Sequence, residues 1–277
     1  MYNRITRDIV LWNPATRKSR LLPKSSNGNP KIGHYHRDFV GLGFDVETKD
    51  YKVIQVSTLE PQNENWFGRL NIPRKVEIYC LSTDSWRLLD SDFQTHCCSA
   101  ALGQSLNGIY YHLGADYTTE TDKYVILSFD LSKEKYQREL QIPDDNSPTL
   151  QSIGDKLACI TAPTWITIRT DGECSGFYIK VWMLNDYHNL EKELWTELYR
   201  VDVTSPKIYT RCPNILAILW NGKYGLFVGE TVALYNFIAD EIEDLGFGEG
   251  MCLCTLTPAI YKESLVSVDA ATKAIST

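Results

Sequence analysis

The pattern of apolar and polar positions repeats along this chain. Five times, a β-prone run is followed by a short polar turn and then by a second β-prone run. Trp12, Tyr79, Phe129, Trp182 and Tyr235 mark equivalent points in the five copies, and they are spaced by 67, 50, 53 and 53 residues. A near-constant period of about 50 residues is typical of a propeller built from four-stranded blades.

The sequence therefore predicts an all-β protein, a kelch-like β-propeller ring of about five to six blades. The first blade is expected to be incomplete, because the first copy of the repeat begins near residue 8. Other predicted strands are 39–44, 51–56, 108–113, 156–160, 217–220, 224–228 and 265–268. In residues 76–81 the alternation of Val, Glu, Ile, Tyr, Cys and Leu predicts a strand with both faces half-buried, as in sheets stacked around a ring. No helix longer than two turns is expected.

We expect one domain over residues 1–268 and a flexible tail over 269–277. The longer first spacing indicates an insertion, roughly Ser57 to Arg74, in which Trp66 and Phe67 stand in loop-like sequence. Aromatic side chains on such a loop either pack against the rim of the ring or bind a partner. Both alternatives stay open at this point.

Composition limits the classes of partner. The formal net charge is −7, from 35 acidic and 28 basic side chains, which argues against sequence-independent nucleic-acid binding. It would suit a basic protein partner, although mild acidity also serves solubility alone. No apolar run is long enough to span a membrane and the N-terminus lacks a signal-peptide pattern. The eight cysteines form no Cys-x-x-Cys pair, so we expect a reducing, cytoplasmic location.

No motif predicts catalysis, a cofactor or a metal. His34 and His36 share a strand face and His96 precedes two cysteines, but no spacing elsewhere completes a zinc site. The glycine clusters at 41–43 and 246–250 are not phosphate-binding loops, and turns and close packing of sheets explain them better. The prediction is a non-enzymatic binding protein, with a propeller hydrolase as a weaker alternative.

The densest charge cluster is the candidate partner-binding site. It comprises Asp240, Glu241, Glu243 and Asp244, and Asp116, Glu120 and Asp122 could belong to the same face. One interpretation is a solvated hairpin tip. The other is an acidic face that meets a basic ligand.

Several blocks resemble a known family. They are Leu11-Trp-Asn-Pro, Gly43-Phe-Asp followed by Asp50-Tyr-Lys-Val, Val76-Glu-Ile-Tyr-Cys-Leu, Leu106-Asn-Gly-Ile-Tyr-Tyr-His and Tyr261-Lys-Glu-Ser-Leu-Val. In this order they resemble the F-box-associated domain of plant F-box proteins, across essentially the whole chain. The last block looks most like the S-locus F-box proteins of pollen self-incompatibility.

This resemblance implies the substrate receptor of an SCF-type ubiquitin ligase. Its target would be a pistil S-RNase, a basic protein, bound in pollen or the pollen tube. An F-box/kelch-type receptor for another signalling or defence protein is the alternative. The family's N-terminal F-box, which binds the Skp adaptor and through it the cullin, is not found in this sequence. We therefore expect this chain to bind a target without joining a ligase.

Overall fold

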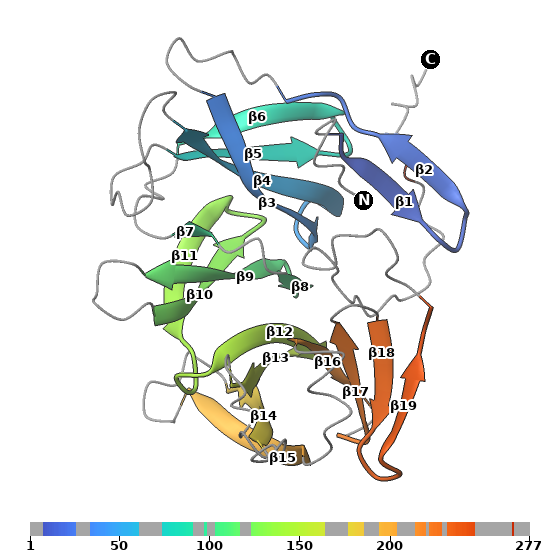
Figure 1. The fold of residues 1–277 in the computed structure, drawn as a ribbon. Helices are drawn as coiled ribbons and strands as arrows, with labels where there is room; N and C mark the ends of the chain where they lie inside the picture. Colours follow the sequence, from blue (N-terminus) through green and yellow to red (C-terminus); the bar gives the residue numbers. More distant parts are fainter. Residues whose placement is uncertain are drawn as a thin grey trace. The chain divides into compact units, whose positions relative to one another are not determined.

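The computed structural model describes residues 8–25, 34–60, 74–90, 97–98, 103–116, 123–163, 177–185, 194–203, 214–219, 222–228, 232–246 and 268. These residues contain five antiparallel sheets and no helix (Figure 1), so the all-β prediction is confirmed. No helix of the described part is therefore long and apolar enough to cross a membrane.

Each sheet is built from strands that follow one another in the sequence, as in a propeller blade. The first described sheet has two strands, β1 (Val10–Asn13) and β2 (Lys18–Leu21). The second runs in the order β3 (His34–Asp45), β4 (Asp50–Glu60), β5 (Arg74–Cys80) and β6 (Ser85–Leu89). The third contains β7 (Cys97–Cys98), β8 (Gln104–Leu106), β9 (Ile109–Asp116), β10 (Lys123–Asp130) and β11 (Lys135–Gln141).

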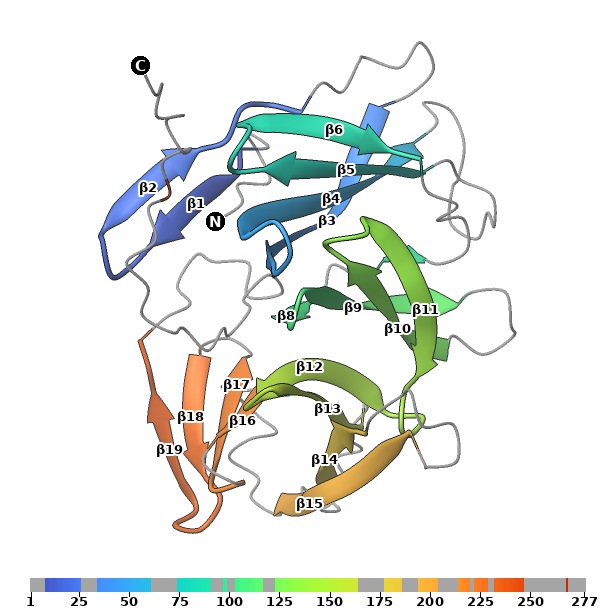
Figure 2. The same cartoon turned by 180° about the vertical axis from the view of Figure 1, so that it is seen from behind.

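The last two sheets have four strands each. One is β12 (Ser147–Ile153), β13 (Lys156–Ala162), β14 (Phe177–Leu184) and β15 (Trp195–Val203). The other is β16 (Asn214–Leu219), β17 (Tyr224–Val228), β18 (Val232–Asn236) and β19 (Glu241–Asp244), and their order can be followed in Figure 2. The five predicted hairpins are β1–β2, β5–β6, β10–β11, β14–β15 and β18–β19, each at the end of its sheet's order.

Four of these hairpins share one turn geometry. In each, the first strand ends at Asn13, Cys80, Asp130 or Asn236. The residue four positions later has a positive φ, between 50° and 56°. Where the first of these residues is Asn or Asp, its side-chain oxygen accepts the backbone N–H two residues on, and the turn is fixed locally. The β3–β4 turn, from Asp45 to Lys49, repeats the same arrangement.

The chain divides into two compact units. The first comprises residues 1–122, 127–139 and 260–277, and the second comprises 123–126 and 140–259. In the first unit, one core cluster includes Ile54, Val56, Val76 and Ile78, and another includes Val53 and Tyr79 together with residues of β1. The β4 and β5 strands are thus buried on both faces, as the alternation in residues 76–81 predicts.

In the second unit, the β12–β15 and β16–β19 sheets share one core. It includes Ile160, Val181, Phe227 and Tyr235. Gln151 joins the two sheets, because its side-chain amide donates to the Ile218 carbonyl at 2.8 Å and its oxygen accepts the Ile218 N–H at 3.0 Å. The buried side-chain amide of Gln151 therefore forms the two hydrogen bonds that the backbone of a neighbouring strand would otherwise form with Ile218.

Several elements differ from the sequence prediction. β4 continues to Glu60 and pairs with β3, so the predicted insertion does not begin at Ser57. β12, which contains Pro148, was not predicted; it lies at the end of its sheet's order, where a strand tolerates proline. Of the predicted strand 265–268, only Val268 is described, as a buried bend against Leu11.

Candidate functional site

The β18–β19 hairpin carries four of the predicted site residues. Asp240 ends its turn, and Glu241, Glu243 and Asp244 lie on β19, all with exposed side chains. Asp116 ends β9, in the other unit from the hairpin. Glu120, Asp122, Trp66 and Phe67 lie outside the described residues.

Asp240 has a structural partner. The Tyr235 hydroxyl donates a hydrogen bond to its carboxylate, and Tyr235 is buried. The same pairing occurs in the β5–β6 hairpin, where the Tyr79 hydroxyl donates to Asp84 at 2.7 Å. Burial together with the Asp84 carboxylate raises the pKa of Tyr79 well above its usual range. Asp240 thus fixes its turn to the core, whereas the carboxylates of Glu241 and Glu243 are exposed on β19.

Glu241 and Glu243 share one face of β19, because alternate residues of a strand point the same way. On this face the cross-strand neighbours are Asn236 and Leu234, and Tyr224 lies beyond Asn236 on β17. The opposite face carries Tyr235 and Ile242 toward the core.

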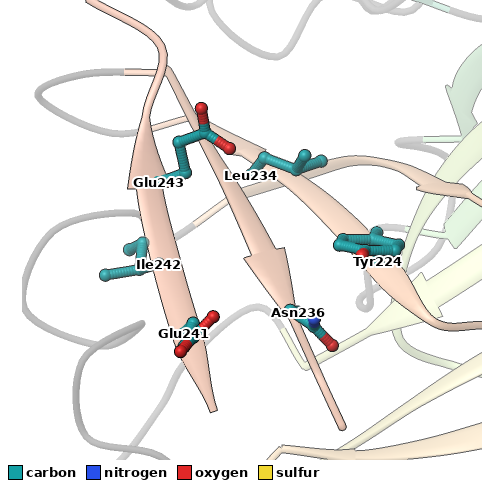
Figure 3. Close-up of a pocket in the computed structure, with 6 residues that line it drawn as sticks. All are labelled: Tyr224, Leu234, Asn236, Glu241, Ile242 and Glu243. Atoms are coloured by element: carbon teal, nitrogen blue, oxygen red, sulfur yellow. The ribbon is translucent and has the colours of Figure 1, made fainter. Parts of the chain in front are cut away.

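These side chains line a pocket of about 480 Å³ (Figure 3). Its lining residues are Tyr224, Leu234, Asn236, Glu241, Ile242 and Glu243. The Asn236 oxygen is engaged by the backbone N–H groups of Ile238 and Ala239. The pocket therefore brings two carboxylates together with the apolar side chains of Tyr224 and Leu234. The ammonium group of Lys223 lies 5.2 Å from the Tyr224 ring centroid.

A second exposed surface was not predicted from the sequence. On β14 and β15, Tyr178 is 52% exposed beneath the Arg200 guanidinium, 5.0 Å from its ring centroid. Lys180 lies 5.4 Å from the centroid of Trp182, whose indole N–H donates to Thr161 at 3.0 Å. The alternation in Tyr178-Ile-Lys-Val-Trp182 is the signal that would have indicated this aromatic face.

Asp144 organises the polar end of this aromatic face. The Thr161 hydroxyl donates to its carboxylate at 2.9 Å, and the Lys180 ammonium lies 3.4 Å from the same oxygen. The Asp144 carboxylate thus links β13 and β14 through polar side chains. No group of three or more potential metal ligands occurs within the parts of the chain that the structure describes.

Comparison with known proteins identifies the family. Residues 1–267 match the F-box associated beta propeller domain. The chain belongs to this family. The F-box-associated domain is 24% identical to F-box only protein 15 of Arabidopsis thaliana, over 86% of this chain and 55% of that protein. It is 25% identical to F-box protein CPR1 of the same plant, over 70% of this chain and 48% of that protein.

The F-box-associated domain thus spans about half the length of these curated relatives. Among solved structures it is similar to a GH32 beta-fructofuranosidase of Bombyx mori, with a TM-score of 0.37 and 11% identity. That similarity covers 79% of this chain and 50% of the enzyme, and no activity is inferred from it.

The structure explains two blocks that carried the resemblance. In Gly43-Phe-Asp and Asp50-Tyr-Lys-Val, Asp45 and Lys52 form a buried ion pair with a 2.6 Å separation. Burial alone would raise the pKa of Asp45, but Lys52 and the hydroxyls of Ser132 and Thr48 outweigh it and hold the pKa well below its usual range. In Leu106-Asn-Gly, Asn107 and Gly108 both have positive φ, as in a type I′ hairpin turn.

Proposed function

We propose that this domain is the substrate-recognition part of an SCF-type ubiquitin ligase, binding a target protein for ubiquitination. Its membership of the F-box-associated family over residues 1–267 is the observation that carries this proposal. The relatives named as F-box proteins extend beyond the matched region, which is where a ligase-binding segment would stand. The domain itself acts by binding and performs no chemistry.

In this proposal the partners are divided between two parts of a receptor. The Skp adaptor and the cullin bind through an F-box, and the domain described above binds the target. The working compartment is the cytoplasm, where the ligase components and the target meet.

For the target we propose a basic protein, with pistil S-RNases as the first candidates. The net charge of −7 and the exposed carboxylates of β19 favour a positively charged partner. A different plant signalling or defence protein is the second candidate. F-box only protein 15 and F-box protein CPR1, two of the relatives that match, are not named for self-incompatibility.

Co-purification tests the proposal. The tagged domain is mixed with a panel of purified S-RNases and with the Skp adaptor, with an unrelated acidic protein of similar net charge as the control. We expect capture of at least one S-RNase and no capture of the adaptor. Capture of the adaptor by this chain would contradict the division of partners. If every S-RNase bound the acidic control equally, the S-RNase assignment would be wrong.

A further inference from the structure

Among the strands that the structure describes, β19 lies at the end of its sheet's order. Among the described strands it pairs with β18 only. The Leu245 N–H donates to the Val232 carbonyl at 2.9 Å, which fixes the alternation of hydrogen bonds along the pair. The backbone groups of Glu241 and Glu243 therefore face β18, and those of Ile242 and Asp244 face away from it. The outer edge can pair with another extended chain.

The face beside this edge suits basic side chains. Glu241 and Glu243 border the pocket, and neither carboxylate makes an ion pair or hydrogen bond with any residue in the described ranges. The pocket is large enough for a side chain of a partner, and Tyr224 and Leu234 offer it an apolar wall. A lysine or arginine can lay its methylene stem on such a wall while its charge meets the carboxylates.

We propose that an extended basic segment of the target adds to β19 as a further antiparallel strand. Ile242 and Asp244 would exchange backbone hydrogen bonds with it, which leaves Glu241 and Glu243 at non-hydrogen-bonded positions. Side chains facing each other at such positions come closest, with Cβ atoms about 4.5–5.5 Å apart. The segment therefore carries Lys or Arg at two positions separated by one residue. This inference rests on the proposed target-binding function.

Repulsion from Glu241 and Glu243 disfavours two other occupants of the β19 edge, a second copy of this chain and an acidic segment. A second copy of this chain pairing through its own β19 would place Glu241 and Glu243 against like charges. An acidic segment would meet the same repulsion. The edge is thus protected from self-association and selective for basic sequences.

A peptide titration tests the proposal. The probe is a fluorescein-labelled peptide, Ser-Lys-Val-Arg-Val-Lys-Ser, titrated with the intact chain at low salt. Glu241→Gln with Glu243→Gln should weaken binding about tenfold, because two carboxylates facing the basic side chains are neutralised. Asp145→Asn with Asp202→Asn removes the same charge from exposed positions elsewhere in the unit and should change the affinity less than about twofold. Equal weakening by both pairs would overturn the proposal.

Two further measurements test strand addition itself. Peptide with N-methyl groups on the amides that face β19 should lose binding, and bound peptide should slow hydrogen exchange at Ile242 and Asp244. Undiminished binding of the N-methylated peptide, or unchanged exchange at both amides, would overturn the proposal. If Glu241→Gln with Glu243→Gln binds the target of the full domain with unchanged affinity, the β19 site is wrong and the target-binding function stands. If the unmodified domain captures no target, the proposed function itself fails.

Discussion

Lys52 carries a buried positive charge that two carboxylates and a backbone oxygen surround. Its ammonium lies 2.6 Å from Asp45, 2.8 Å from Glu134 and 2.8 Å from the Leu131 carbonyl oxygen. Asp45 ends β3, whereas Leu131 and Glu134 are the first and last residues of the turn between β10 and β11. Residues about 80 positions apart in the sequence are thus fixed together by one side chain.

Lys52→Met should destabilise the chain by about 3–5 kcal/mol, since the buried Asp45 carboxylate keeps its charge but loses the cation paired with it, whereas Glu134 keeps its ion pair with Arg87. Urea unfolding at pH 7 measures the change. Lys133→Met is the control, because Lys133 is 69% exposed and its pairing with Asp130, at 3.2 Å, contributes less than about 1 kcal/mol. Equal costs for the two substitutions would contradict the structural role of Lys52.

His112 predicts a pH dependence of stability. Burial lowers its pKa from 6.5 to about 3, within a cluster formed with Phe39, Tyr110 and Tyr136. Below pH 6.5 the unfolded chain binds a proton that the folded chain refuses until about pH 3, so stability falls across this window. Between pH 7 and pH 5 the natural chain should therefore lose about 2 kcal/mol more than His112→Phe. Urea-unfolding midpoints that change equally with pH in the natural chain and in His112→Phe would contradict this assignment.

The elements were predicted where local chemistry dictates them. Polar turns and β-branched runs located the five hairpins, and Asx side chains fix most of those turns within a few residues. β12 could not be predicted, because its proline is compatible with a strand only at the end of a sheet, and sheet order is a tertiary property. The register shift between β14 and β15, at Val181 and Trp182, was likewise not visible in the repeat.

Close packing of neighbouring sheets gives an element-scale prediction. A Cβ atom added to Gly41 on β3 would overlap the ring of Tyr110 on β9, and both belong to the same compact unit. Gly41→Ala should cost about 1–3 kcal/mol in thermal or urea unfolding, because a rigid ring must move. Adding Tyr110→Leu to Gly41→Ala should cost less than the two single costs combined, since the overlap disappears. Strict additivity would contradict the contact.

At the scale of the whole molecule, the sequence predicted the propeller family and part of the candidate site. The acidic run was visible because its four carboxylates lie within five consecutive residues. The pocket was not, since Tyr224, Leu234 and Asn236 reach Glu241 and Glu243 only through the registers of β17, β18 and β19. Nor could the sequence distinguish Asp240, whose carboxylate accepts a hydrogen bond from Tyr235, from the exposed carboxylates of Glu241 and Glu243.

Target-dependent ubiquitin transfer tests the central claim most directly. The domain is joined to a plant F-box and assembled with the Skp adaptor, cullin and RING subunits, and ubiquitin transfer to the protein that the domain captures is measured. We predict transfer that requires both the F-box and the F-box-associated domain and that excess free domain suppresses by competing for the target. Transfer that continues at the same rate without the domain would contradict its role as the substrate receptor.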